Sequence, residues 1–164
     1  MTRKIEVERF SLITSKSFDD VVAAINAGIG HPDIGEFAKL TDDTRSAAEL
    51  ESRIEKVVGK TGLMLFLALD QGAIISKTTD RENSRMMRFL IGNPLIMKEM
   101  AKHVPDAGSY APITVLVDER ADGVHLSYDR MASLLTPYEN SDSLDVARNL
   151  DTKVEDLLRR AAAL

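Results

Sequence analysis

The chain has 164 residues, of which 44% are hydrophobic, and its 21 basic and 26 acidic residues give a net charge of −5. This length suits a single domain, residues 1–164, with one well-buried core, and the scattered basic residues of an acidic chain argue against a nucleic-acid partner. The absence of cysteine excludes disulfides, thiolate nucleophiles, iron–sulfur clusters and thiolate zinc sites.

Membrane and export signals are also missing from the sequence pattern. No run approaches the roughly 18 apolar residues that a bilayer crossing needs, and the first residues, MTRKIEVERF, lack the apolar segment of a signal peptide. We therefore expect a cytoplasmic protein that does not insert into a membrane.

The first third of the chain has the pattern of one strand followed by helices. Residues 5–14 mix alternation with β-forming residues and predict a strand. Ser17, followed three residues later by an acid, predicts a helix start, and glycines near residue 30 predict its end. Residues 33–43 are ambiguous, and a helical pattern returns from about Thr44 to Gly59. We expect an inserted helical segment at about residues 31–60.

Residues 63–75, LMLFLALDQGAII, form a long β-type run. Asp70-Gln71-Gly72 interrupts this run as a polar bulge or bend, so the pattern predicts one central strand. Residues 77–85 are charged and predict a solvated hairpin loop, which leads into a strand that begins at Met86.

A strand and a helix meet at Gly92-Asn93-Pro94. Asparagine is a good N-cap and proline suits the first helical position, so a helix begins here with its backbone amides and positive dipole end exposed. An anion could bind there, more so if Arg85, Arg88 or Lys98 converge on it, but the same residues also simply turn a strand into a helix.

The last third predicts a hairpin and a long helix. Two alternating segments, ITVLVDER and GVHLSYD, flank Ala121-Asp122-Gly123, a strong hairpin signal. From Leu144 to Ala161 the apolar residues follow a helical stripe. Tight connections and alternation favour an α+β fold. We expect a curved antiparallel sheet with the long C-terminal helix packed on one face.

Four blocks between Leu63 and Leu135 resemble the family called domain of unknown function 302. In this chain the blocks read Leu69-Asp70-Gln71, Ile91-Gly92-Asn93-Pro94, Ala111-Pro112 and Ser127-Tyr128. The resemblance implies a fold of the TATA-binding-protein-like (TBP-like) class, with strand, helix, four strands and closing helix (β-α-β4-α), but implies no activity. Gln71 replaces a histidine that is frequent in the family, which weakens an acid–base role at this position.

Two further residues are candidates for chemistry. Asp70 lies in an apolar run, where a carboxylate needs donors or a cation, and it could equally be an active acid or a group that stabilises a bulge by accepting hydrogen bonds from backbone amides. Tyr128 ends a strand, and its hydroxyl could reach a site or simply reach water from the core. His31, His103 and His125 lack the spacing of metal ligands, so we expect no metal and no cofactor.

These patterns leave three hypotheses. The first is a non-enzymatic binding or interaction domain, a homodimer, whose cleft between sheet and helix accepts a small, partly apolar ligand with an anionic group. Its ligand-binding candidates are Asp70, Arg88, Asn93 and Tyr128. The second is a cofactor-free enzyme in which Asp70 is the general acid or base and Tyr128 orients the substrate or stabilises charge, which requires that they share one cleft. The third is a purely structural dimerisation module.

Overall fold

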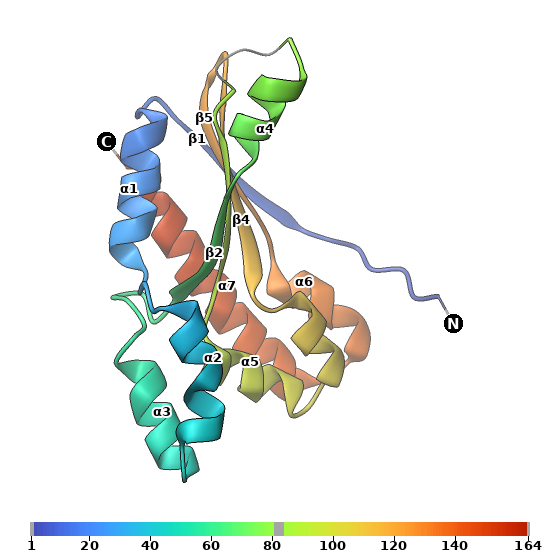
Figure 1. Ribbon diagram of the computed structural model, residues 1–164. Coiled ribbons are helices and arrows are strands. Elements are labelled where there is room, and N and C mark those ends of the chain that lie inside the picture. Colours follow the sequence, from blue (N-terminus) through green and yellow to red (C-terminus); the bar gives the residue numbers. More distant parts are fainter. Residues whose placement is uncertain (1, 81–83, 164) are drawn as a thin grey trace.

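The fold is built on one five-stranded antiparallel sheet in the order β1-β5-β4-β3-β2 (Figure 1). The computed structural model describes residues 2–80 and 84–163. The curved sheet and its helices confirm the predicted α+β class. The strands are β1 (Arg9–Thr14), β2 (Met64–Asp70), β3 (Met86–Gly92), β4 (Ile113–Arg120) and β5 (Gly123–Asp129).

The predicted hairpin forms between β4 and β5. Gly123 has φ +135°, a conformation that L side chains rarely adopt, which explains glycine in this tight connection. Alternation then directs Val124, Leu126 and Tyr128 of β5 to the buried face of the sheet, whereas His125 and Ser127 lie on the other face. The prediction for this strand is confirmed.

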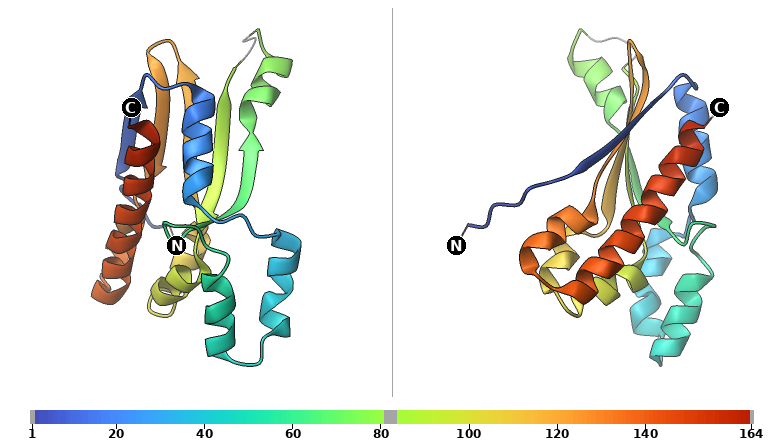
Figure 2. Two further views of the ribbon diagram at one scale, coloured as in Figure 1. Left: turned by 90° about the vertical axis from the view of Figure 1, so that its left-hand side faces the viewer. Right: turned by 180° about the vertical axis from the view of Figure 1, so that it is seen from behind.

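Two helices cover one face of the sheet. Helix α1 (Phe18–Gly28) begins at Ser17, whose hydroxyl accepts from the amide of Asp20, and helix α7 (Ser141–Ala162) closes the chain. Both lie side by side against the same face in the left view of Figure 2. Their apolar stripes meet the inward side chains of the strands in one core. This face of the sheet carries most of the buried apolar surface.

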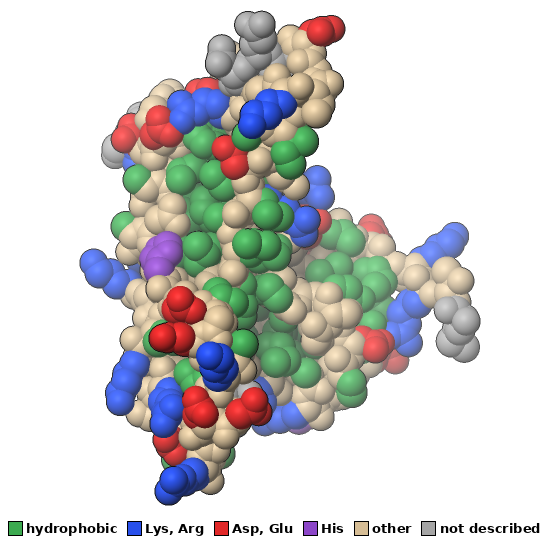
Figure 3. All heavy atoms as spheres, viewed as in Figure 1, with side chains coloured by type: hydrophobic (Ala, Val, Ile, Leu, Met, Phe, Trp, Pro, Cys, Tyr) green, Lys and Arg blue, Asp and Glu red, His purple; other side chains and the backbone are tan. Residues whose placement is uncertain are grey.

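On the opposite face of the sheet, the open face, the described part of the chain has helices at the two ends (Figure 1). At one end lies α4 (Gln71–Thr78), and at the other lie α5 (Pro94–Ala101), the 3₁₀ helix η1 (Pro105–Tyr110) and α6 (Met131–Leu135), with the short 3₁₀ turn η2 (Thr136–Tyr138) after it. The exposed side chains between these ends include Leu67, Leu69 and Ile13. Figure 3 shows hydrophobic side chains gathering over β2, between α4 and the inserted helices.

The inserted segment forms two helices, α2 (Ile34–Asp43) and α3 (Ala47–Glu55), which extend beyond one end of the sheet (Figure 1). Residues 33–43, ambiguous in the sequence, are therefore a full helix with Asp33 as N-cap. The segment is anchored where Gly30 and Gly59 both donate from their amides to the carbonyl of Leu63, at 2.9 Å each. Phe37 of α2 also packs edge-on against Phe66 of β2.

Two predictions of strand position were wrong. The run of residues 63–75 is not one central strand, because β2 is an edge strand that ends at Asp70 and α4 begins immediately after it. The Asp70 carboxylate accepts from the amide of Ala73 at 2.8 Å and so caps a helix instead of forming a bulge. The first strand begins at Arg9, later than the predicted residue 5.

Within the described residues, no helix is long and apolar enough to cross a membrane.

Candidate functional site

A groove of about 650 Å³ lies on the open face, near predicted site residues. It crosses strands β3, β4, β5 and β1 and is bounded at its ends by the start of α4 and by η1 and α6. Pockets that bind small molecules usually measure about 300–1,000 Å³, so this groove is large enough for one. Its lining includes Arg9, Gln71, Arg88, Leu90, Ser109, Tyr110, Thr114, Leu116, Ser127, Asp129 and Leu134.

Arg88, in the middle of β3, is the distinctive group of this groove. Its Nη2 donates to Oγ1 of Thr114 at 3.2 Å, whereas its Nε is buried without a hydrogen-bond partner. Across the described residues, no carboxylate lies within ion-pair distance of this guanidinium. A half-buried charge that lacks a counter-ion is costly, so Arg88 is a cation that an anionic ligand could neutralise.

The other charges of the groove compensate one another. Arg9 of β1 forms a bidentate pair with Asp129 of β5, with Nε to Oδ1 at 2.6 Å and Nη2 to Oδ2 at 2.9 Å. Asp129 is the one acid among the groove-lining residues that the structure describes. The lining therefore carries one uncompensated positive charge, at Arg88, although the whole chain has a net charge of −5.

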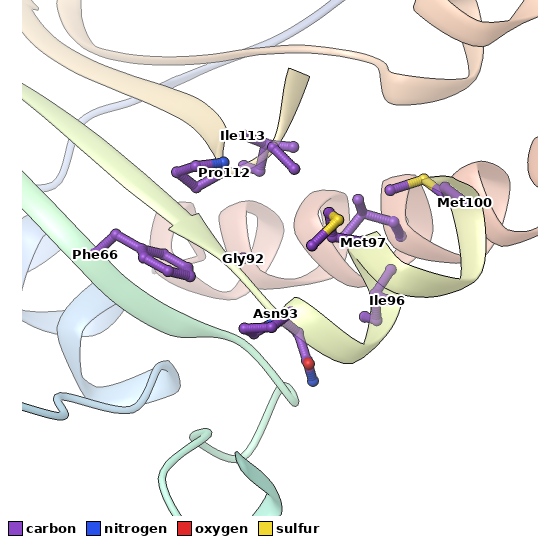
Figure 4. A pocket seen from close by; sticks show the side chains of 11 residues that line it. Phe66, Gly92, Asn93, Ile96, Met97, Met100, Pro112 and Ile113 are labelled. Atoms are coloured by element: carbon purple, nitrogen blue, oxygen red, sulfur yellow. The ribbon is translucent and has the colours of Figure 1, made fainter. Parts of the chain in front are cut away.

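A second, smaller hollow lies beside the groove, where β3 meets α5 (Figure 4). It measures about 130 Å³, and apolar side chains form nearly all of its wall. Phe66 lies on one side, Pro112 on another, and Met97 with Met100 closes it from α5 (Figure 4). The remaining lining comes from Gly92, Asn93, Pro94, Ile96, Ala111, Ile113 and Leu150. We call this hollow the Phe66 pocket.

The groove and the Phe66 pocket adjoin each other, because Ala111, Pro112 and Ile113 line both. Strand β3 runs from one to the other: Leu90 lines the groove, and Gly92, two residues on, lines the pocket. Residues two apart in a strand lie on the same face. The open face thus offers two adjoining compartments: a groove that contains Arg88 and other polar groups, and an apolar pocket.

Asp70 lines neither compartment. Its side chain is exposed, and its carboxylate caps α4 through the amide of Ala73. The next residue, Gln71, does line the groove. A primary amide can position a ligand by hydrogen bonding but does not titrate near neutral pH.

Tyr128 borders the groove, but its hydroxyl is directed to the covered face. It donates to Oδ1 of Asp151 on α7 at 2.6 Å and accepts from the amide of Met131 at 3.2 Å. Burial, the negative charge of Asp151 and the hydrogen bond to that carboxylate together raise the pKa of Tyr128 far above its ordinary value. The phenol is therefore a neutral structural group.

Asp70 and Tyr128 do not share a cleft. Strands β3 and β4 separate β2 from β5, and three strand spacings amount to about 14 Å. The requirement that the enzyme hypothesis placed on these two residues is not met by this arrangement.

Asn93 has the structural role that its sequence context predicts and also forms part of the Phe66 pocket. Its Oδ1 accepts from the amide of Leu95 at 2.8 Å, and its Nδ2 donates to the carbonyl of Gly62 at 2.8 Å. Both polar atoms of this side chain therefore already have partners within the chain. The Gly92-Asn93-Pro94 junction is a well-made turn, and all three of its residues line the Phe66 pocket.

Sequence reasoning placed Arg88 and Asn93 near one another but missed Thr114, Phe66 and Pro112. The Gly-Asn-Pro and Ala-Pro blocks were the available signal, because these two short blocks lie side by side at the pocket. The bond between Arg88 and Thr114 had no such signal, since it depends on the register between β3 and β4.

Comparisons with known proteins agree with this fold. The chain resembles the crystal structure of an uncharacterized conserved protein, DUF302, from Bacillus stearothermophilus, with a TM-score of 0.65 and 10% identity over 93% of this chain and 97% of that one. At this identity the likeness concerns the fold alone. No curated protein matches the chain. The sequence model described as "Domain of unknown function DUF302" matches residues 39–161. Because this match covers most of the sequence, the chain belongs to the DUF302 family.

Proposed function

We propose that the protein is a small-molecule-binding domain without catalysis of its own, whose ligand occupies the groove and the Phe66 pocket. The observation that carries this proposal is the uncompensated Arg88 in a groove of about 650 Å³. A few polar groups in a concave, partly apolar wall are typical of small-ligand sites. The ligand is partly apolar and carries an anionic group.

The wall composition supports binding over simple imperfect packing. Leu90 and Leu116 provide apolar contact, while Thr114 and Ser127 offer hydroxyls beside them. These side chains come from three adjacent strands, which fix their positions through the ladders that pair β3, β4 and β5. A site on rigid strands holds its groups in place without a ligand.

Native mass spectrometry of gently purified protein tests the proposal. We expect an additional mass that disappears when the protein is denatured. The variant Leu116→Trp adds bulk to the groove and should lose this mass, whereas Ile13→Trp, on the same face but outside the groove lining, should keep it. Bare protein that no compound of a small-molecule library stabilises against heat would contradict the proposal, because a ligand specific to the folded state raises its stability.

We also propose that the protein is a homodimer, with the second copy packed on an apolar rim formed by Leu67, Leu69 and Ile74. These side chains of β2 and α4 are 45%, 37% and 64% exposed. Exposed apolar patches mark interaction sites, and a two-fold contact places the same patch on both partners. The rim lies at the β2 edge, where Leu67 and Leu69 pair with Leu90 and Arg88 of β3, so the proposed dimer contact borders the groove.

Sedimentation velocity tests the dimer and its interface. Wild type should sediment as a dimer and Ile74→Glu as a monomer. The matched control is Ile13→Glu, which changes a side chain 57% exposed at the opposite edge of the sheet and should remain dimeric. A monomeric wild type would refute the dimer, and dissociation by Ile13→Glu alone would place the interface elsewhere.

The TBP-like fold class is part of the same proposal. The order of one strand, a helix, four strands and a closing helix supports it, with α2 and α3 inserted after α1. A shared fold transfers no nucleic-acid binding, and the acidic net charge opposes that activity.

A further inference from the structure

We propose that the ligand of this site is a small monocarboxylate whose charged end pairs with Arg88 and whose compact apolar end enters the Phe66 pocket. This inference rests on the proposed function, and it adds the charge, length and shape of the ligand. Three features of the open face lead to it.

The first feature is the number of uncompensated charges. Arg9 is already paired with Asp129, so Arg88 is the single unpaired cation among the described groove-lining residues. A guanidinium matches the planar geometry of a carboxylate and binds it through charge-assisted hydrogen bonds. A phosphate ester would bring close to two negative charges at pH 7, which this groove in a chain of net charge −5 does not balance. The charge count favours a monoanion.

The second feature is the distance between the two compartments. Because Nη2 of Arg88 bonds to Thr114, and Thr114 pairs with Leu90, the guanidinium leans along β3 toward Gly92. Leu90 and Gly92 are two residues apart, which is about 7 Å along a strand. A carboxylate joined to an apolar group by two or three methylenes spans such a distance.

The third feature is the size of the Phe66 pocket. Its volume of about 130 Å³ is near that of an apolar cavity of roughly 150 Å³ that accepts benzene in another protein. A phenyl ring or a branched alkyl group of similar bulk fits, and a fused ring system does not. Phe66 and Pro112 flank the space above Gly92, so the ring would lie between them.

Isothermal titration calorimetry with a matched set of compounds tests the inference. The length series is phenylacetate, 3-phenylpropionate and 4-phenylbutyrate, and we expect the tightest binding from one of the two longer acids. The charge series is 3-phenylpropionate, 3-phenylpropan-1-ol, 3-phenylpropylamine and 2-phenylethylphosphonate. We expect the alcohol to bind at least tenfold more weakly than the acid, because charge-assisted hydrogen bonds are lost, and the amine not to bind.

Two variants assign each end of the ligand. Arg88→Gln should remove the preference for the acid over the alcohol, whereas Arg160→Gln, an exposed arginine of α7, should leave it unchanged. Gly92→Ala should weaken all phenyl compounds, because its methyl group would enter between Phe66 and Pro112. The nearest atoms lie at 3.6 Å, an ordinary contact, so this variant keeps its fold, and its unfolding temperature verifies that.

The outcomes separate the inference from the proposed function. Equal binding of acid and alcohol, or tighter binding of the phosphonate, would overturn the inference that the ligand is a monocarboxylate. The proposed ligand site would stand if Leu116→Trp still blocks binding. Tight binding of the acid that survives both Arg88→Gln and Gly92→Ala would place the ligand elsewhere. Failure of every compound, together with bare protein in native mass spectrometry, would overturn both.

Discussion

The hydroxyl of Tyr128, near the end of β5, donates a 2.6 Å hydrogen bond to Asp151 on the C-terminal helix. The same carboxylate accepts from the amides of Met131 at 2.8 Å and Ala132 at 3.1 Å, which are the first residues of α6. Asp151 therefore joins β5, α6 and α7 and supplies the cap that α6 lacks from Arg130. The network explains why a phenol and a carboxylate can lie in a mostly apolar interior.

Removing the Tyr128 hydroxyl should destabilise the protein without affecting ligand binding. Tyr128→Phe leaves the buried carboxylate and the Met131 amide with fewer partners, which costs about 1–3 kcal/mol in the free energy of unfolding. Urea denaturation measures this. The control is Tyr110→Phe, whose hydroxyl has only a long 3.4 Å contact with Tyr138 and should change stability little. Loss of ligand binding in Tyr128→Phe at unchanged stability would give the phenol a functional role.

The pH dependence of stability should reveal Asp151. Burial raises the pKa of Asp151 above its ordinary value of 3.8, despite the three donors around it. The folded state therefore holds this proton more tightly than the unfolded state. The resulting stabilisation is fully present below the unfolded pKa and is lost as pH rises through the folded pKa.

A comparison of wild type with Asp151→Asn isolates this effect, because the other titrating groups are common to both. Asparagine has one acceptor oxygen where three donors converge, so the variant should be less stable at all pH values. Denaturation at pH 4 to 7 should show the advantage of wild type shrinking as pH rises. An advantage that grows with pH would mean that the donors stabilise the ionised carboxylate more than burial opposes it.

Local signals in the sequence predicted the elements whose causes are local. The β4–β5 hairpin depends on Asp122-Gly123, and α5 depends on the cap and proline that begin it. The β2–α4 boundary failed because residues 63–75 are apolar throughout, so periodicity could not separate a strand from a short helix. The sequence showed Asp70 only as a carboxylate in an apolar run, where an unpaired charge is costly, and gave no sign that it begins a helix.

The groove could not be predicted in the same way, because its residues come from four strands. The order of these strands in the sheet, β1-β5-β4-β3, cannot be inferred from local sequence patterns. Arg88 was chosen for its position near the Gly-Asn-Pro junction. Its significance in the structure comes from two observations. Arg88 donates to the hydroxyl of Thr114, and Arg9, the other cation of the groove, is already paired with Asp129. Tyr128 was chosen for the end of its strand, but the register directs its hydroxyl to α7.

The Asn93 side chain should stabilise the junction of β3 and α5 by two separate bonds. Asn93→Ala removes the cap of α5 and the bond to the carbonyl of Gly62, so we expect a loss of about 1–2 kcal/mol. Asn93→Asp keeps the capping oxygen and adds a charge that the helix dipole favours, so it should recover part of this loss. Chemical denaturation of both variants measures the difference. Equal losses would show that the bond to Gly62 carries the effect.

The close backbone contact between Gly30 and Gly59 should be needed for the inserted helices to dock on the sheet. A Cβ atom at Gly30 would lie 1.8 Å from the carbonyl oxygen of Val57, and this backbone cannot move without disturbing the bonds to Leu63. We expect Gly30→Ala to cost about 3 kcal/mol, the upper part of the usual range for overpacking. The control is Gly108→Ala, where the added atom meets nothing within 4 Å. Differential scanning calorimetry should show a large decrease in unfolding temperature for the first and almost none for the second. An unchanged unfolding temperature for Gly30→Ala would show that this close contact between Gly30 and Val57 does not limit the stability of the fold.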